Sequence, residues 1–513
     1  MILTDDDRLI VSASDITTVA SCEFRYLRRV DVLLGRAVRE RVDDPFRDQL
    51  ADLGRAHESD VDQQHRANHD DFVVAPRAAF PFTTASLTAA AHETKALVHA
   101  GHSVIAQPVL FSDGVFAIPD YLIRQADGAY EVWDAKLARS VKPEAALQLA
   151  VCAALLDQMG VASHTSGGLF LGDGTDATVD LAELTEDARR HLARARRLFV
   201  DHQADTDAFA WGDDSAMACG SCDDCSAAIE EHHDVKLVYK LRMKDRQHLR
   251  DAGITTIQEF AESTGPVDGI APARLETLRA QARLQAQQVV HDDGSVTVAF
   301  EVFDPGPIAR MPAPSDGDVF FDFEGDSMVV HEDGSLGIEY LWGLHEASAS
   351  GGEYVHAWAE DRTQEGEALQ WFCERISSRL SVHPDLHIYH YGGYEITALK
   401  RLCQQHGIGE EQVHSWIDAE LFVDLNKVVM KSIRISQPKY GLKYLEPLYS
   451  PPRTAGVQNA RASMVGFADY IALLSSGDTE GASKLRTDLI NYNRDDCLST
   501  QGLRDWLTAL DLR

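Results

Sequence analysis

Residues 115–140, VFAIPDYLIRQADGAYEVWDAKLARS, decide the fold of the first part of the chain. Two β-rich runs flank the turn residues ADG at 126–128, so this stretch is expected to form a β-hairpin. Asp120 is expected on its first strand, and Asp134 and Lys136 on one face of its second strand, because they are two residues apart. Two carboxylates and a lysine that converge can bind a divalent metal ion beside an attacking water. The alternative is a solvent-exposed face with a surface ion pair, but Asp134 follows apolar residues and would be costly to bury unpaired.

Two flanking segments extend this pattern. LGRAHESDV, residues 53–61, carries His57 in a helical context, and ALQLAVCAALL carries Gln148 and, four residues later, Cys152. Together with the hairpin they resemble the RecB-type branch of the PD-(D/E)xK nucleases, which usually has tyrosine where this chain has Cys152. The resemblance implies that Asp120 and Asp134 carry a metal ion, that His57 completes the site, and that Lys136 orients the nucleophilic water. Gln148 would position the lysine or the substrate. Carboxylate ligands favour Mg²⁺, and a histidine ligand favours Mn²⁺.

Three of the eight cysteines lie within the seven residues CGSCDDC, at Cys219, Cys222 and Cys225. A structural zinc ion or an iron–sulfur cluster requires a fourth thiolate, and Cys22 near the N-terminus is the candidate. Such a centre would hold the two ends of a domain together. A zinc knuckle or coincidence remains the alternative. The RecB-type resemblance, in which one cysteine precedes the nuclease core and three follow it, implies a [4Fe–4S] cluster.

The middle of the chain is locally basic. Residues 238–264 have apolar residues at helical spacing on both sides of a DAGITTI turn and resemble a helix–hairpin–helix, whose backbone amides approach phosphate. Lys244, Arg246 and Arg250 are then expected to contact a nucleic-acid backbone. A plain helical linker is the equal alternative. Prolines and glycines at residues 303–317 mark a domain boundary.

A second set of carboxylates follows that boundary. DVFFDFEGD places Asp322 and Glu324 on one face of a strand, and LINYNRDDCLSTQGLRDWL places Tyr492 and Asp496 four residues apart on one helix face. With Glu395 in HIYHYGGYEITALKRL, these motifs resemble the tyrosine variant of the DEDD exonucleases, with a glutamate where most members have aspartate. SLGIEYLWGL and KYGLKYLEPLY further resemble a bacterial branch fused to RecB-like nucleases. The resemblance implies an RNase H-like fold, two divalent ions held by the four carboxylates, and Tyr492 orienting the attacking water.

The spacing favours Asp496 over its neighbour Asp495, which would point about 100° away around the helix. Asp424, in LFVDLNKV, is interpreted as a strand-end residue rather than a metal ligand.

The formal net charge of −33 argues against a generic basic nucleic-acid surface but leaves room for metal ions that bridge carboxylates to phosphates. The sequence shows no signal-peptide pattern and no apolar run of about 18 residues, and its few cysteines do not form a secreted disulfide pattern. We therefore expect a cytoplasmic protein without a membrane span.

The expected fold class is α/β with three parts. These are a PD-(D/E)xK nuclease domain with the cysteine centre at 1–230, a helical joint at 231–300, and an RNase H-like exonuclease domain at 315–513. The expected function is metal-dependent hydrolysis of single-stranded or frayed DNA in repair or processing, with Mg²⁺ or Mn²⁺. The alternatives are a non-catalytic nucleic-acid-binding partner of a helicase and an RNA-directed exonuclease. No P-loop signature is present, so unwinding would need a helicase partner.

Overall fold

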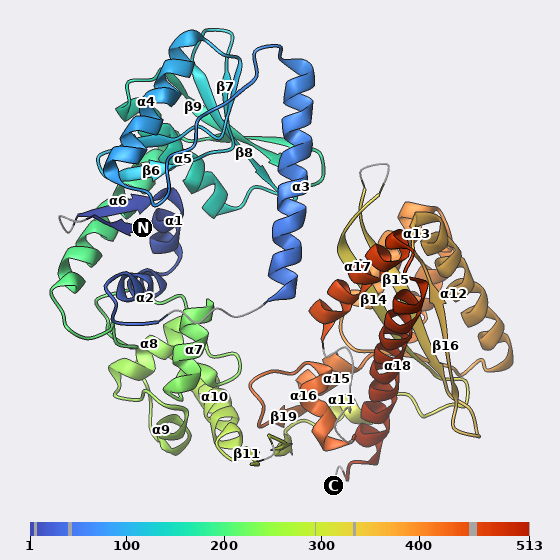
Figure 1. Ribbon diagram of the computed structural model, residues 1–513. Coiled ribbons are helices and arrows are strands. Elements are labelled where there is room, and N and C mark those ends of the chain that lie inside the picture. Colours follow the sequence, from blue (N-terminus) through green and yellow to red (C-terminus); the bar gives the residue numbers. More distant parts are fainter. Residues whose placement is uncertain (5–7, 39–43, 293, 332–334, 451–458, 512–513) are drawn as a thin grey trace. The chain divides into compact units, whose positions relative to one another are not determined.

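The computed structural model describes residues 1–4, 8–38, 44–292, 294–331, 335–450 and 459–511 (Figure 1). The chain divides into two units, Met1–His232 and His233–Arg513. The helices of the expected joint belong to the second unit. Each unit has its own sheet and its own buried core, so each is described by itself.

The first unit is organised around a mixed sheet with the strand order β10-β9-β8-β7-β4-β3. Its strands are β3 (Val73–Val74), β4 (Val104–Ala106), β7 (Tyr121–Arg124), β8 (Tyr130–Lys136), β9 (Ser163–Leu171) and β10 (Asp176–Asp180). Strands β7 and β8 pair antiparallel, with Tyr121 opposite Trp133, which confirms the expected hairpin. Asp120 lies one residue before β7 rather than within it. Strand β8 pairs parallel with β9, so its carboxyl end lies inside the sheet.

Helices cover both faces of this sheet (Figure 1). The helices of the first unit are α1 (Ala13–Ser21), α2 (Glu23–Leu33), α3 (Pro45–Asn68), α4 (Thr84–Ala100), α5 (Pro143–Gln158), α6 (Ala182–Gln203) and α7 (Asp223–Glu231), of which α3 and α5 lie on opposite faces of the sheet. A smaller sheet joins β1 (Ile2–Leu3), β2 (Leu9–Ser12), β6 (Val115–Ala117) and β5 (Leu110–Ser112) in that order.

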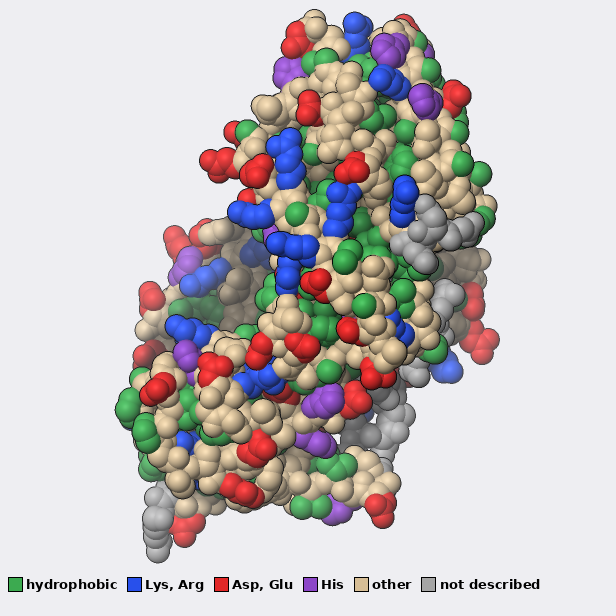
Figure 2. Space-filling model, turned by 90° about the vertical axis from the view of Figure 1, so that its left-hand side faces the viewer, with side chains coloured by type: hydrophobic (Ala, Val, Ile, Leu, Met, Phe, Trp, Pro, Cys, Tyr) green, Lys and Arg blue, Asp and Glu red, His purple; other side chains and the backbone are tan. Residues whose placement is uncertain are grey.

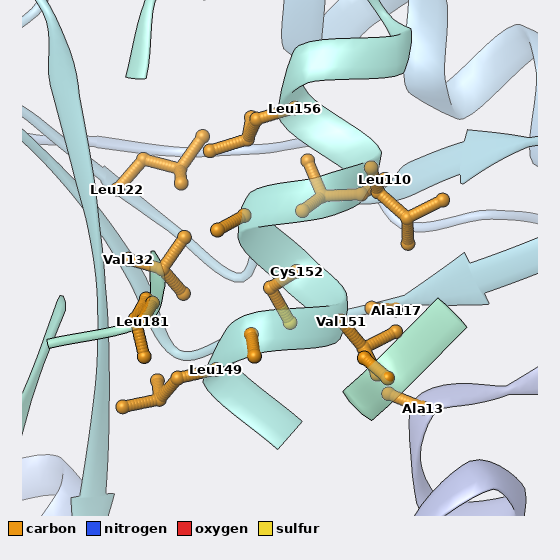
Figure 3. Close-up of a cluster of buried hydrophobic side chains, with 14 of the residues drawn as sticks. Ala13, Leu110, Ala117, Leu122, Val132, Leu149, Val151, Cys152, Leu156 and Leu181 are labelled. Carbon is orange, nitrogen blue, oxygen red and sulfur yellow. The ribbon is translucent and has the colours of Figure 1, made fainter. Parts of the chain in front are cut away.

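The main core of the first unit lies between α5 and the sheet. Cys152 on α5 is 1% exposed and packs among apolar side chains such as Val132 and Leu149 (Figure 3). Its burial is typical of a free cysteine, which packs as a small apolar residue. On the other face, Val61 of α3 packs near Tyr121 and Trp133. The alternation of Val132 and Trp133 between the two faces follows from the two-residue period of a strand.

The second unit begins with a helical segment. Its elements are η1 (Val235–Leu237), α8 (Met243–Asp251), α9 (Ile257–Glu262) and α10 (Pro272–Gln285), followed by β11 (Val289–Val290), β12 (Val296–Thr297), β13 (Phe300–Val302) and α11 (Gly306–Ala309). Helices α8 and α9 flank a turn in which Gly253 has a φ of 78°, a value that glycine adopts without strain. Helix α10 contacts β19 (Ile433–Ile435), where Gln281 Nε2 donates to the Ile435 carbonyl at 2.9 Å.

The rest of the second unit is a mixed sheet with the order β16-β15-β14-β17-β18. Its strands are β14 (Val319–Val330), β15 (Leu336–Glu346), β16 (Glu353–Trp358), β17 (Ile388–His390) and β18 (Phe422–Asp424). Strands β14, β15 and β16 pair antiparallel, whereas β17 and β18 run parallel to β14.

Helices pack on both faces of this sheet as well. The helices of this part of the chain are α12 (Arg362–Val382), α13 (Tyr394–His406), α14 (Glu410–Asp418), α15 (Leu425–Ser432), α16 (Leu442–Leu445), η2 (Glu446–Leu448), α17 (Ala460–Ser476) and α18 (Thr479–Ala509), of which α12 and α18 lie on opposite faces of the sheet. Phe321 and Phe323 of β14 pack with Phe372 of α12, whereas Phe320 packs with Leu503 of α18. Asp322 and Glu324 alternate with Phe321 and Phe323 and therefore face α18.

Candidate active sites and a four-cysteine group

In the first unit, the hairpin brings together Asp120, Asp134 and Lys136. The backbone N–H of Asp120 donates to Asp134 Oδ1 at 2.9 Å, and the N–H of Ala135 donates to Asp120 Oδ2 at 2.8 Å. Lys136 Nζ lies 3.0 Å from Asp134 Oδ2. Each aspartate is thus held by the backbone beside the other, and the lysine lies on the same side of the strand as Asp134.

Burial makes this group electrostatically unusual. Asp134 is 1% exposed. Burial, together with the charge of Asp134, raises the pKa of Asp120 to about 7. Burial alone would lower the pKa of Lys136, but the carboxylates of Asp134 and Asp120 outweigh it and raise that pKa. The ammonium group is therefore retained, and Asp120 holds a proton below neutral pH when no cation is present.

Helix α3 presents Glu58, rather than His57, to this group. His57 Nε2 lies 3.0 Å from the carbonyl oxygen of Phe170. Gln107 Nε2 donates to Glu58 Oε1 at 2.6 Å and to Asp120 Oδ1 at 3.2 Å, and so links the two carboxylates. Burial and the nearby Asp62 raise the pKa of Glu58.

Sequence reasoning missed both Glu58 and Gln107. The signal for Glu58 was the adjacent acid in AHESD, one residue after the histidine. Gln107 has a φ of 52°, which is uncommon for a residue other than glycine. No periodicity in the sequence marks such a position. Gln148 of α5 lines a pocket together with Lys136.

The four cysteines Cys22, Cys219, Cys222 and Cys225 converge, and their sulfur atoms all lie within 4.8 Å of one another. Cys22 joins α1 to α2, and Cys222 caps the start of α7. The Cys22–Cys225, Cys222–Cys22 and Cys219–Cys225 sulfur atoms are 3.5, 3.8 and 3.9 Å apart.

Backbone amides surround this four-cysteine group. The N–H groups of Arg25 and Cys219 each donate to the Cys22 sulfur at 3.4 Å. The hydrogen bond from the Cys225 thiol, with these amides, holds the pKa of Cys22 well below its usual value. Donors around sulfur stabilise thiolates, which are the form that binds metal ions. The donor set therefore fits a thiolate-bound metal centre.

In the second unit, Asp322, Glu324 and Asp496 form a group whose carboxylate oxygens lie within 4.8 Å of one another. Strand β14 supplies the first two residues, and α18 supplies Asp496. Asn493, one turn before Asp496, donates from Nδ2 to Asp322 Oδ2 at 2.9 Å and so ties α18 to β14. Asp495 lies outside the group, with an oxygen 3.5 Å from Arg494.

The acidic group is buried enough to favour a bound proton or cation. Glu324 is 6% exposed, and burial together with Asp496 raises its pKa to about 8. Ser463 of α17 donates to Glu324 Oε2 at 2.6 Å. Three close carboxylates cannot all ionise cheaply unless positive charge lies between them. Their oxygen donors fit Mg²⁺ or Mn²⁺.

Tyr492 lies on the same face of α18 as Asp496, and a lysine that sequence reasoning left without a role contacts it. Lys443 Nζ donates to the Tyr492 hydroxyl at 2.9 Å and lies 4.4 Å from the centre of its ring. The charge of Lys443 also lowers the pKa of Glu324, against the larger effect of burial. The signal was the lysine within KYGLKYLEPLY, but only the packing of α16 brings it to α18.

Glu395 does not join the group of three. It lies in the first turn of α13 and is 4% exposed, and its Oε2 is 3.2 Å from Nδ1 of the buried His390. Asp424 ends β18 and caps α15, where its Oδ1 accepts from the Lys427 N–H at 3.2 Å. Asp424 therefore has the structural role that the sequence indicated.

In the helical segment, Arg246 is not available to a phosphate backbone. It is 4% exposed, and its guanidinium group donates to both carboxylate oxygens of Asp234 at 2.7–3.0 Å. The expectation that Arg246 contacts nucleic acid is therefore wrong, because its charge is neutralised inside the unit. Lys244 is exposed.

The excess of acidic residues does not give a uniformly negative surface. On the face shown in Figure 2, Lys and Arg side chains gather in one zone among scattered Asp and Glu. Among the helices that the structure describes, each is too short or too polar to cross a lipid bilayer.

Comparison with protein families identifies the second fold. Residues 319–508 match the family model described as RNase_H superfamily. No curated protein matches the chain. The matched range runs from β14 to α18, the two elements that bring Asp322, Glu324 and Asp496 together. Residues 319–508 form an RNase H-like domain, which indicates a nuclease-type phosphodiester hydrolase.

Proposed function

We propose that the protein is a metal-dependent DNA nuclease with two active sites, an RNase H-like 3′–5′ exonuclease of the DEDD type and a RecB-like PD-(D/E)xK nuclease. The single observation that carries the proposal is the close group of Asp322, Glu324 and Asp496 inside the RNase H-like domain, in which Glu324 and Asp496 are buried and Tyr492 shares a helix face with Asp496.

In the second unit, the three carboxylates would hold the divalent ions, which when bound supply Lewis-acid stabilisation of developing charge and a nucleophilic water. Tyr492 would orient the attacking water, and Lys443 holds the Tyr492 oxygen in place through its 2.9 Å hydrogen bond. Glu395, the expected fourth carboxylate, would join the site only by leaving His390.

In the first unit, Asp120 and Asp134 would hold the ion, with Glu58 supported over His57 as the third ligand because Gln107 links Glu58 to Asp120. The charge of Lys136 lies 3.0 Å from Asp134, where it can orient water and offset charge on a phosphate. The substrate we propose is single-stranded or frayed DNA, in repair or processing. A helicase partner and a cytoplasmic location are part of the same proposal.

The four cysteines would hold a metal centre that closes the first unit, and the resemblance to RecB-type nucleases supports [4Fe–4S]. One observation favours a single zinc ion as the second candidate for this centre. Metal–sulfur bonds of about 2.3 Å in a tetrahedron place sulfur atoms about 3.8 Å apart, which a single zinc ion requires. The separations of 3.5–3.9 Å agree with that spacing. Iron, sulfide and zinc analysis of anaerobically purified protein decides between the two.

The test of the proposed function is a nuclease assay of the full chain on 5′-labelled single-stranded DNA with Mn²⁺. Lys136→Ala should remove one product class and Asp322→Ala the other, each by about 10³-fold. Lys136→Ala removes a positive charge that would stabilise the transition state, and Asp322→Ala removes a carboxylate that would hold the divalent ions. Asp322→Ala should end the release of mononucleotides from the 3′ end. Asp495→Ala, next to Asp496 but outside the group, is the matched control and should keep full activity.

Three results would count against the proposal. Full activity of the variant that combines Lys136→Ala and Asp322→Ala would refute both site assignments. Binding of DNA without cleavage by the wild-type protein would identify the non-catalytic alternative. Preference for an RNA oligonucleotide of the same sequence would identify the RNA-directed alternative.

A further inference from the structure

A pocket of about 310 Å³ lies beside Lys136 in the first unit. The segment that links β8 to α5 forms one wall, the first turns of α5 form a second, and α1 contributes Thr17. The other polar residues that line it are Lys142, Ser140, Glu144 and Gln148. The pocket therefore continues from the candidate catalytic lysine along the surface of the same unit.

The wall next to Lys136 is basic in a strongly acidic chain. Residues 135–143, AKLARSVKP, contain three basic residues and no acidic one, whereas the whole chain has 81 acidic and 48 basic residues. Lys136 and Lys142 both line the pocket, and Glu144 is its one carboxylate. Such a local reversal of charge attracts an anion.

Two polar groups of the pocket are available to a ligand. Lys142 is exposed and precedes the first turn of α5, and its side chain makes no capping hydrogen bond. The start of this 16-residue helix favours negative charge in addition. The half-buried Gln148 also lines the pocket, and its amide carries both donors and an acceptor. The Thr17 hydroxyl donates to the Ser14 carbonyl oxygen at 3.0 Å, and the Thr17 side chain lines the pocket.

The size of the pocket limits its ligand. About 310 Å³ is at the lower end of the range of roughly 300–1,000 Å³ typical of ligand pockets. This volume admits one nucleotide but not a base pair. The position beside Lys136 places that nucleotide next to the phosphodiester that the first unit would cut.

We propose that this pocket binds the phosphate and sugar of the nucleotide adjacent to the scissile phosphodiester in a single DNA strand, with Lys142 and Gln148 as its contacts. The proposal rests on the nuclease function proposed for the first unit. It assigns to that site a preference for single-stranded over paired DNA.

The test measures binding and cleavage separately in the full chain that carries Asp322→Ala. Binding of a fluorescein-labelled oligo(dT), with and without a 5′-phosphate, is followed by anisotropy in EDTA at several salt concentrations. Lys142→Glu should weaken binding at least fivefold and reduce the slope of log K against log[salt] by about 0.7, the value for one phosphate contact on a single strand. In the cleavage assay with Mn²⁺, KM should rise at least fivefold and kcat should change less than twofold.

Two further variants distinguish binding of DNA in the pocket from nonspecific attraction of DNA to positive charge. Thr17→Leu fills the wall without changing charge and should also weaken binding. Arg77→Glu makes the same change of charge at an exposed position outside the pocket and should leave both affinity and salt slope unchanged. Loss of affinity only for the 5′-phosphorylated strand identifies a terminal phosphate as the ligand, and equal loss for both strands identifies an internal one.

Unchanged affinity and salt slope in Lys142→Glu and Thr17→Leu would refute the proposal that this pocket binds a DNA strand, whatever the cleavage assay shows. Equal effects of Lys142→Glu and Arg77→Glu would also overturn it, because they would indicate nonspecific attraction. Absence of cleavage with normal oligo(dT) binding would refute the proposed nuclease function of the first unit. The binding data would still show whether the pocket binds a DNA strand.

Discussion

The two carboxylate sites are assembled in opposite ways. In the first unit, Asp120 and Asp134 belong to one hairpin, and each accepts a hydrogen bond from the backbone next to the other. In the second unit, β14 supplies two acids and α18 supplies Asp496 from far along the chain. Local backbone geometry fixes the first site, whereas the packing of helices on a sheet fixes the second.

The positive charges show the same difference. Lys136 lies two residues from Asp134 on the same strand and contacts it directly. Lys443 comes from α16, a separate element, and reaches the second site through Tyr492. The second site should therefore be disturbed by any change that moves α16, α18 or β14 relative to one another. The first site should persist as long as its hairpin is folded.

The largest expected effect concerns the cysteines and tests whether the two units are independent. Cys22→Ser removes one of four thiolates, and a structural metal centre can contribute about 10 kcal/mol or more to folding. We expect the first unit to lose its cooperative thermal transition and its cleavage products. The second unit should still release mononucleotides from a 3′ end. Calorimetry and product analysis of the full chain measure both outcomes.

Cys152→Ala is the matched control, because Cys152 is equally buried but lies on α5 in the apolar core rather than in the four-cysteine group (Figure 3). It should cost only the loss of a small buried side chain. A Cys22→Ser protein that melts and digests like the wild type would show that Cys22 holds no metal.

The second largest expected effect concerns Lys443, the positive charge that α16 brings to the second site. Lys443→Met removes the hydrogen bond to Tyr492 but keeps the length of the side chain. We expect kcat for release of 3′ mononucleotides to fall about 10²-fold with KM nearly constant, since a misplaced positioning group costs this much. Lys443→Arg should restore part of the rate. Single-turnover kinetics with Mg²⁺ measure the effect.

Lys427→Met serves as the control, because Lys427 also pairs with a carboxylate, Asp424, but its side chain is 71% exposed. An equal loss in both variants would indicate a general effect of removing a lysine. A change in KM alone would mean that Lys443 binds substrate rather than holds Tyr492.

The contrast between local and distant assembly also explains how much the sequence could predict. The hairpin, the strand at Val319–Phe323 and the helix that carries Tyr492 follow from short-range patterns, and the structure confirms all three. Lys443 and Glu58 could not be assigned, because their roles depend on how a helix packs against an element that is distant in the sequence, α18 for Lys443 and the β7–β8 hairpin for Glu58. Periodicity within a segment carries no information on such packing.

Two expectations show the limits of residue type as evidence. Arg246 lies in a basic segment and was expected to contact phosphate, but Asp234 binds it inside the unit. Glu395 lies in the right motif, but His390 holds its carboxylate. Asp234 lies outside the basic segment of residues 238–264, whereas His390 lies within the same motif, five residues before Glu395. The residue type of Arg246 or Glu395 specifies neither pairing.

The smallest expected effect is the pH dependence of the stability of each unit when no metal ion is bound. The folded-state pKa is about 7 for Asp120 and about 8 for Glu324, above the ordinary values of 3.8 and 4.5. A raised folded-state pKa means that the proton favours the folded state. Its contribution is complete below the ordinary pKa and is lost as the pH rises through the folded-state value. In EDTA, the stability of the first unit should therefore fall between about pH 4 and 7.

For the second unit, the same fall should extend from about pH 4.5 to 8, and each loss should amount to a few kcal/mol. Denaturation with urea at fixed pH measures both. Mg²⁺ or Mn²⁺ at pH 8 should restore the lost stability, because the cation replaces the proton between the carboxylates. Asp120→Asn should flatten the pH dependence of the first unit only, and Glu324→Gln that of the second only. If either substitution flattens both, the two units do not titrate independently; if added cations stabilise neither unit, the carboxylate groups are not metal sites.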